Sequence, residues 1–261
     1  MSSLQNVIDQ FVRDDESLTL DAPPAWSQGR TLYGGMTAAL CHEAARPLID
    51  PGAHLRSAQF AFVGPASGSL RLIPTVARQG RSSSVVTVDM VAEDTLAAKA
   101  IFTFGSPRES VIAFDRGSFP SVPPPEDCHP LFPPGGTPAS FFNNFDMRTA
   151  AGSALISGGA PDLCLWVRFG EEQTVNPVTA LLALADAPPP AAMTLFPQPA
   201  AISTATWAID LMHGPADANA WHLLRSTGEQ AVDGYAMQDM TLWDSTGRRL
   251  IQGRQCVAIF I

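Results

Sequence analysis

The C-terminal part of the chain contains three stretches typical of β-strands: AWHLLRST at 220–227, DGYAMQDMTLW at 233–243 and RLIQGRQCVAIF at 249–260. Segments rich in Gly, Asp and Ser separate them at 228–233 and 244–247, and such segments favour tight turns. Short strands joined by tight turns form an antiparallel sheet. This stretch therefore predicts a sheet in which one strand ends at Thr227 and another contains Gln255.

The same pattern, a buried helix with an antiparallel meander, occurs twice along the chain. Residues 31–46 are small and apolar on almost every side, which is typical of a buried helix, and another helix is expected at 4–13. Strands are predicted after the first buried helix at 54–63, 69–79, 82–92 and 97–105. The second copy has a strand at 162–169, a helix at 177–187, and strands at 201–213, 219–227, 233–243 and 248–260. FAFVGP at 60–65 aligns with DLMHGP at 210–215, which indicates an internal repeat.

Each copy alone would expose one face of its helix and one edge of its sheet, and pairing the copies buries both. The sequence therefore predicts an α+β fold, a double hot-dog made of two tandem helix-wrapped antiparallel sheets. We expect hot-dog domains at 1–113 and 139–261, joined by a linker at 114–138 that is rich in Pro and Gly.

The composition excludes several classes of partner. The net charge of −9 argues against a nucleic-acid ligand. No N-terminal signal pattern and no apolar run of about 18 residues occurs, so no membrane partner is expected. Four scattered cysteines predict reduced thiols in a cytoplasmic protein and no metal site. The low charged fraction, 16%, indicates extensive buried sheet or a homo-oligomer.

The sequence resembles the acyl-CoA thioesterase II family over nearly its whole length. The specific parts are YGG at 33–35, RQGRS at 78–82, the end of the second helix at 181–190, and the C-terminal strands. The resemblance implies hydrolysis of acyl-CoA without a cofactor, by water that an Asp, a Thr and a Gln hold in place.

Two of the three residues of that family site have a counterpart in this sequence, and the third does not. The resemblance places its Thr at Thr227 and its Gln at Gln255, whereas Trp207 occupies the place of its Asp. Two carboxylates are candidates for the missing base, and we favour Asp186 at the end of the second helix. Asp210 is separated from Trp207 by three positions on a strand, so it would need a bulge to reach the same face.

Substrate binding is expected at the start of the first buried helix. Gly34 and Gly35 leave backbone N–H groups uncovered, and these can bind a thioester carbonyl. Tyr33 precedes them and is counted with the binding residues, although its ring is expected to pack. Cations that could meet CoA phosphates are Arg56, Arg78 and Arg81.

Two other functions remain open from the sequence. An enoyl-CoA hydratase would need an Asp and a His about one turn apart near the buried helix, which contains no Asp. His42 and Glu43 are adjacent there, so their side chains should diverge by about 100° and one should face elsewhere. Trp207 in place of the acid would suit an acyl-thioester binder without catalysis. The absence of a G-x-S-x-G motif argues against a serine hydrolase.

Overall fold

A computed structural model describes residues 3–133 and 135–261. The N-terminal half contains α1 (Leu4–Ile8), β1 (Val12–Arg13), β2 (Leu18–Asp21), β3 (Ser27–Gln28), β4 (Thr31–Leu32), α2 (Gly34–Ala45), β5 (His54–Phe62), β6 (Ser69–Gln79), β7 (Ser83–Ala92) and β8 (Thr95–Gly105). The C-terminal half contains β9 (His129–Pro130), β10 (Phe145–Gly152), β11 (Asp162–Phe169), α3 (Pro177–Ala185), β12 (Ala201–Leu211), β13 (His222–Val232), β14 (Tyr235–Asp244) and β15 (Arg249–Phe260). Short 3-10 helices lie at Pro24–Trp26, Arg46–Leu48, Pro125–Asp127, Ser140–Asn144 and Ala191–Leu195.

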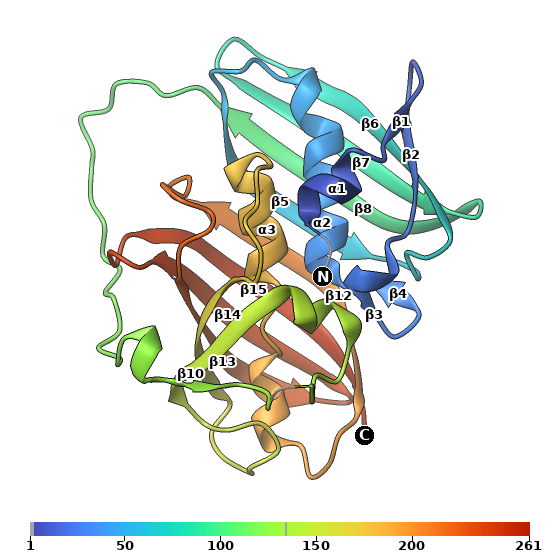
Figure 1. Ribbon diagram of the computed structural model, residues 1–261. Helices are drawn as coiled ribbons and strands as arrows, with labels where there is room; N and C mark the ends of the chain where they lie inside the picture. The colour runs from blue at the N-terminus through green and yellow to red at the C-terminus, as the bar shows by residue number, and fades with distance from the viewer. Residues whose placement is uncertain (1–2, 134) are drawn as a thin grey trace.

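In the described part of the chain, one antiparallel sheet of thirteen strands joins the two halves, in the order β1-β2-β6-β7-β8-β5-β12-β15-β14-β13-β11-β10-β9. The halves meet where β5 pairs with β12, from Ala61 opposite Thr206 to Ser57 opposite Asp210. The sheet wraps around the two helices, with one copy of the fold on each side of this central pair (Figure 1). The predicted double hot-dog is confirmed. The domain limits at 113 and 139 stay a prediction, because one sheet and one core span both copies.

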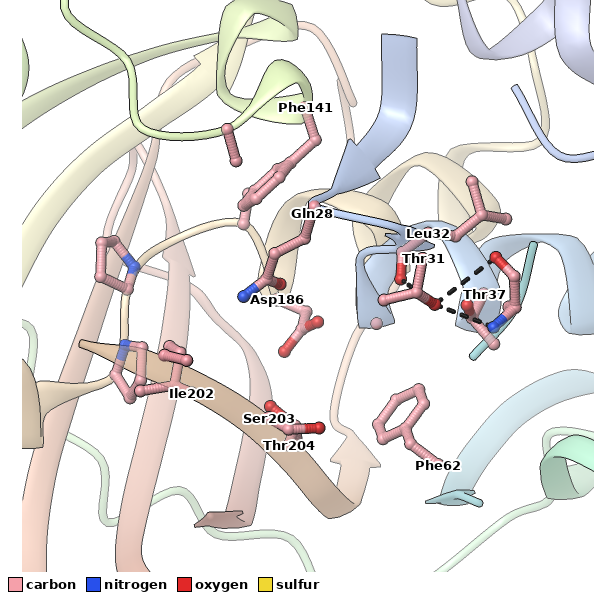
Figure 2. Close-up of a pocket in the computed structure, with 18 of the residues that line it drawn as sticks. Gln28, Thr31, Leu32, Thr37, Phe62, Phe141, Asp186, Ile202, Ser203 and Thr204 are labelled. Atoms are coloured by element: carbon pink, nitrogen blue, oxygen red, sulfur yellow. Dashed lines mark hydrogen bonds between the residues drawn. The ribbon is translucent and has the colours of Figure 1, made fainter. Parts of the chain in front are cut away.

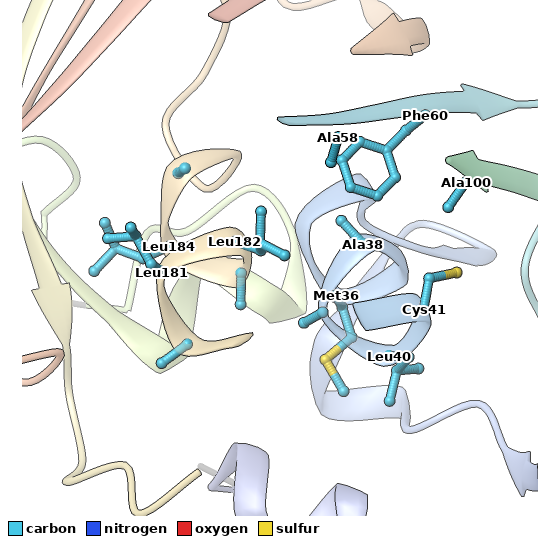
Figure 3. Packing of buried hydrophobic residues seen from close by; sticks show 14 of the residues in the cluster. Met36, Ala38, Leu40, Cys41, Ala58, Phe60, Ala100, Leu181, Leu182 and Leu184 are labelled. Carbon is cyan, nitrogen blue, oxygen red and sulfur yellow. The ribbon is translucent and has the colours of Figure 1, made fainter. Parts of the chain in front are cut away.

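The two helices pack side by side in the middle of the molecule because both are apolar on nearly every side. All residues of α2 after Gly34 are buried. Leu181, Leu182 and Leu184 of α3 lie in the same core cluster as Met36 and Leu40 of α2 (Figure 3). A Cβ added at Gly35 would lie 2.6 Å from the carbonyl oxygen of Ala183, so glycine permits this close helix contact.

Several boundaries differ from the sequence prediction. The N-terminal helix ends at Ile8, and α2 begins at Gly34 because Thr31–Leu32 pairs with Ser27–Gln28 as a strand. The strand expected to end at Thr227 continues to Val232 through a bulge between Gly228 and Gln230. The second helix ends at Ala185 rather than at 187.

Other elements were absent from the prediction. Strand β10 was not expected, and the linker region contains a short 3-10 helix and β9. No helix in residues 3–133 and 135–261 is long and apolar enough to cross a membrane.

Candidate active site

A cavity of about 670 Å³ lies where the N-terminus of α2 meets the C-terminus of α3. Figure 2 shows Asp186, Phe62, Phe141, Ser203 and Thr204 around it. Further wall residues are Gln28, Arg30, Thr31, Gly34, Thr37, Phe132, Phe142, Met193, Ile202 and Gln255. The wall therefore combines many apolar side chains with a few polar groups, which is typical of a site for a small organic ligand.

Asp186 is the acidic residue in this wall, and it occupies the C-cap position of α3. Burial raises the pKa of Asp186 from 3.8 to about 7 because the charged form loses hydration. Hydrogen bonds from the Gln255 side chain and the Gly35 backbone N–H oppose that rise, since both stabilise the carboxylate. The Asp186 carboxyl group therefore changes protonation state near neutral pH, as an efficient general base requires.

A chain of hydrogen bonds fixes the orientation of the Gln255 amide. The backbone N–H of Ala191 donates to Oε1 of Gln238 at 2.8 Å. Because that contact takes the oxygen of Gln238, its Nε2 donates to Oε1 of Gln255 at 2.6 Å. Nε2 of Gln255 then faces Asp186 and donates to Oδ1. The network thus assigns each amide orientation, and the carboxylate receives a donor that cannot take its proton.

The start of α2 is shaped to admit the carboxylate. A Cβ added at Gly34 would lie 2.6 Å from Oδ2 of Asp186 and 3.0 Å from the ring of Phe62. Among residues 3–133 and 135–261, no side chain caps the N-terminus of α2. The N–H of Gly35 is instead used by Asp186. The first backbone donors of the helix therefore face the acid and the cavity.

Two family models match this chain. Residues 22–105 match the acyl-CoA thioesterase N-terminal domain, and residues 125–259 match the acyl-CoA thioesterase C-terminal domain. The chain belongs to the acyl-CoA thioesterase family. Its membership covers both copies of the fold, in agreement with the resemblance seen in the sequence.

Solved structures with the same fold cover nearly all of this chain. A hot-dog-fold protein of unknown function from Alicyclobacillus acidocaldarius superposes with a TM-score of 0.89 at 21% identity, over 100% of this chain and 99% of that one. Acyl-CoA thioesterase II TesB2 from Mycobacterium marinum superposes with a TM-score of 0.80 at 17% identity, over 99% and 98%. At these identities the likeness shows the fold alone.

A curated sequence relative matches over a shorter region. An uncharacterised protein of Mycobacterium tuberculosis is 31% identical over 99 residues, which are 34% of this chain and 33% of the relative. The match thus spans about a third of the curated relative.

Thr227 does not lie beside Gln255 in this chain. Gln255 pairs with Gln238 across β14 and β15, and both side chains are buried. Thr227 pairs instead with Asp239, which pairs with the exposed Arg254. Because successive strand residues alternate faces, Thr227 lies on the outer face of the sheet and Gln255 on the inner one. The expected pair is wrong because β13 extends beyond Thr227 in a register that turns this residue outward.

Thr204 is the threonine whose position beside Gln255 matches the one expected for Thr227. It lines the cavity together with Asp186 and Gln255. Thr204 pairs with Val257, two positions from Gln255 on β15, so the two are diagonal neighbours on the inner face. A bulge between Thr204 and Thr206 puts Thr204 on the same face as Trp207, three positions away. Sequence alternation alone could not reveal that bulge.

Trp207 is a core residue. It is 1% exposed and stacks on Phe60 of β5, with 5.2 Å between ring centroids, at the joint between the two halves. Asp210 points to the outer face and is exposed, so it stays away from the cavity. Asp186 is the candidate base that the fold brings to Gln255.

The other expected substrate-binding residues are placed differently. Tyr33 is 1% exposed, donates its hydroxyl to the carbonyl oxygen of Ala183 at 2.9 Å and stacks on Phe141, so it packs rather than binds. Arg78 and Arg81 lie at the β6–β7 turn, whereas the cavity is bordered by Ala97 near the opposite end of β8. Neither arginine lines the cavity, and their expected contact with CoA phosphates stays a prediction. Arg30 is the arginine in the described cavity wall.

Proposed function

We propose that this chain hydrolyses acyl-CoA thioesters to a free acid and CoA, with Asp186 as the general base. The observation that supports this most is a buried carboxylate with a pKa of about 7 that receives the amide N–H of Gln255 inside an apolar cavity. A base of that pKa is efficient near neutral pH.

The reaction needs no covalent intermediate. Water held near Gln255 and Thr204 gives a proton to Asp186 as its oxygen attacks the thioester carbon. The carbonyl oxygen becomes an oxyanion that the half-buried start of α2 stabilises, with Gly34 N–H as the donor not used by Asp186. The oxyanion then re-forms the carbonyl, the C–S bond breaks, and Asp186 returns the proton to the departing CoA sulfur.

The cavity wall suits the two parts of such a substrate. Phe62, Phe141 and Phe142 offer an apolar surface for the acyl chain. Arg30 is exposed at the same wall, where it can meet a CoA phosphate.

The test is release of free thiol from medium-chain acyl-CoA by the purified protein and by Asp186→Asn. The isosteric amide keeps the shape of the site but removes the base, so kcat should fall by roughly a hundredfold or more. Asp210→Asn is the matched control, because Asp210 is exposed on the outer face of β12. Equal rates for the native protein and Asp186→Asn would reject the proposal.

The alternatives from the sequence predict other results. A binder without catalysis would show a thermal shift with acyl-CoA and no thiol release. A hydratase reaction would add water to an enoyl-CoA without releasing CoA, and His42 and Glu43 do not line this cavity. Homo-oligomerisation and a cytoplasmic location stay predictions, to be checked by light scattering and by fractionation.

A further inference from the structure

A second cavity of about 660 Å³ lies at the other end of the helix pair, where α2 ends and α3 begins. Its apolar wall includes Ile49, Leu55, Phe104, Val178 and Leu211. Its polar wall consists of His42, Arg46, Asp50, His54, Arg56, Asn176, His213 and Arg248. None of these residues belongs to the Asp186 site.

The fold is duplicated, and the second cavity lies at the position in one copy that corresponds to the Asp186 site in the other. A bulge between Leu55 and Ser57 in the β5–β8 ladder repeats the one between Thr204 and Thr206 in the β12–β15 ladder. Counted from these bulges, Leu55 corresponds to Thr204. Ala58 and Trp207 lie at the same position after their bulges. Ala58 pairs with Phe102 and Trp207 pairs with Gln255, so Phe102 corresponds to Gln255. The helix C-caps also correspond, and they are Arg46 and Asp186.

The chemistry of the two sites is therefore different at every matched position. Arg46 and Leu55, which line the second cavity, replace the carboxyl and hydroxyl groups of the first site. Phe102, which is buried against the His42 ring with 5.8 Å between ring centroids, replaces the amide. The C-cap of the helix is therefore a cation at the second cavity and an acid at the first. A site with those groups has no base placed like Asp186, and it attracts anions instead.

The cationic groups at the second cavity exceed its acids, although the chain carries a net charge of −9. Arg46 is bound to the buried carboxylate of Glu43 at 3.1 Å. Arg56 and Arg248 are exposed, and within the described part of the chain neither has a carboxylate partner within 4.0 Å. Nε of Arg56 donates to the carbonyl oxygen of Gly105 at 3.2 Å, which orients this guanidinium but leaves its charge without an acidic partner. Together the two guanidinium groups match the charge of a phosphate monoester and can bind it.

The inner wall contains an oriented histidine. The Thr179 hydroxyl donates to Oε1 of Glu43 at 2.5 Å, so it accepts from Nδ1 of His42 at 2.8 Å. His42 and Glu43 thus meet at one hydroxyl of α3, which corrects the expectation that one of them faces elsewhere. Nε2 of His42 remains as an acceptor for a ligand that lies on the apolar wall.

We propose that this second cavity is a binding site for an organic phosphate, with the phosphate held by Arg56 and Arg248 and the organic body resting on the apolar wall beside His42. The site is separate from hydrolysis at Asp186 and does not depend on it.

Histidine resonances provide the test, because three of the five histidines line this cavity and His129 and His222 do not. Adenosine monophosphate is titrated into histidine-labelled Asp186→Asn protein while the ring C–H signals are recorded. Saturable shifts are expected for His42, His54 and His213. Adenosine without phosphate should shift none of them, and inorganic phosphate should bind at least about tenfold more weakly because it lacks the apolar contact.

Matched variants separate this site from unspecific charge effects. The double variant Arg56→Ala with Arg248→Ala should weaken binding at least about tenfold. Arg254→Ala, an exposed arginine on the outer face of β15, should bind like the parent. Absence of saturable shifts up to about 5 mM, or equal weakening by Arg254→Ala, would overturn the proposal. Equal affinity for inorganic phosphate would overturn the role of the organic body.

Discussion

The side-chain amide of Gln238 donates to the side-chain oxygen of Gln255 at 2.6 Å, and this contact orients the donor that Gln255 directs at Asp186. The catalytic carboxylate of the proposed mechanism thus depends on a residue one strand further away. Gln238 lies outside the cavity wall, yet it determines which end of Gln255 faces the acid.

Gln238→Leu should release the Gln255 amide from its fixed orientation. We expect kcat to fall roughly tenfold, and the pKa seen in the rate profile to rise, because Asp186 loses a steady donor. Gln252→Leu is the control, since Gln252 lies on the opposite face of β15 and accepts a hydrogen bond from the Thr241 hydroxyl. A Gln238→Leu enzyme with a lower rate and an unchanged pH profile would contradict the positioning role.

The hydrolysis rate should depend on the protonation of Asp186. Because the base acts as a carboxylate and burial raises its pKa to about 7, kcat/KM should rise about tenfold per pH unit below 7 and level off above it. The measurement is thiol release between about pH 5 and 9 with a continuous, pH-insensitive readout. A profile that is flat across that range would exclude Asp186 as the base.

The raised pKa of Asp186 also makes the folding stability depend on pH, and the stability falls as the pH rises. The folded-state pKa lies above the ordinary value of 3.8, so folding favours the protonated acid, and this stabilisation is lost as the pH rises from about 4 through 7. Asp186→Asn should therefore gain about 1 kcal/mol or more at pH 8, or ~2–4 °C in Tm. The gain should shrink toward pH 5, and a constant difference at both pH values would contradict the linkage.

Thr204→Val and Thr227→Val form a matched pair of isosteric changes. Only Thr204 lies on the inner face with Gln255, so Thr204→Val should lower kcat about tenfold by removing a partner of the attacking water. Thr227→Val should leave the rate within about twofold, because its side chain faces outward. The reverse order of effects would restore the assignment made from the sequence.

The two glycines at the start of α2 should respond differently to alanine. A methyl group at Gly34 would meet Oδ2 of Asp186 and Phe62, so activity should fall at least about tenfold while the fold persists. A methyl group at Gly35 would meet the backbone carbonyl of Ala183, so unfolding should become easier by about 1–3 kcal/mol. Thermal melts and thiol release on both variants distinguish the two effects.

Local sequence determined the elements and their duplication. Small apolar residues on all sides require a buried helix, and alternating strands with Gly- and Asp-rich turns require a meander, so the double hot-dog followed from hydrophobic burial alone. The same reasoning placed Asp186 at a helix end and Gln255 on the last strand.

Only the tertiary structure decided which threonine hydroxyl lies with Asp186 and Gln255 at the cavity. A bulge at Ala205 and the extension of β13 beyond Thr227 each change which residues face inward, and one residue of register reverses every side chain on a strand. The raised pKa of Asp186 likewise arises from burial between α2 and β15, segments far apart in the chain. Hydrophobic pattern is local and can be seen in the sequence, whereas strand register and desolvation depend on contacts that exist only after folding.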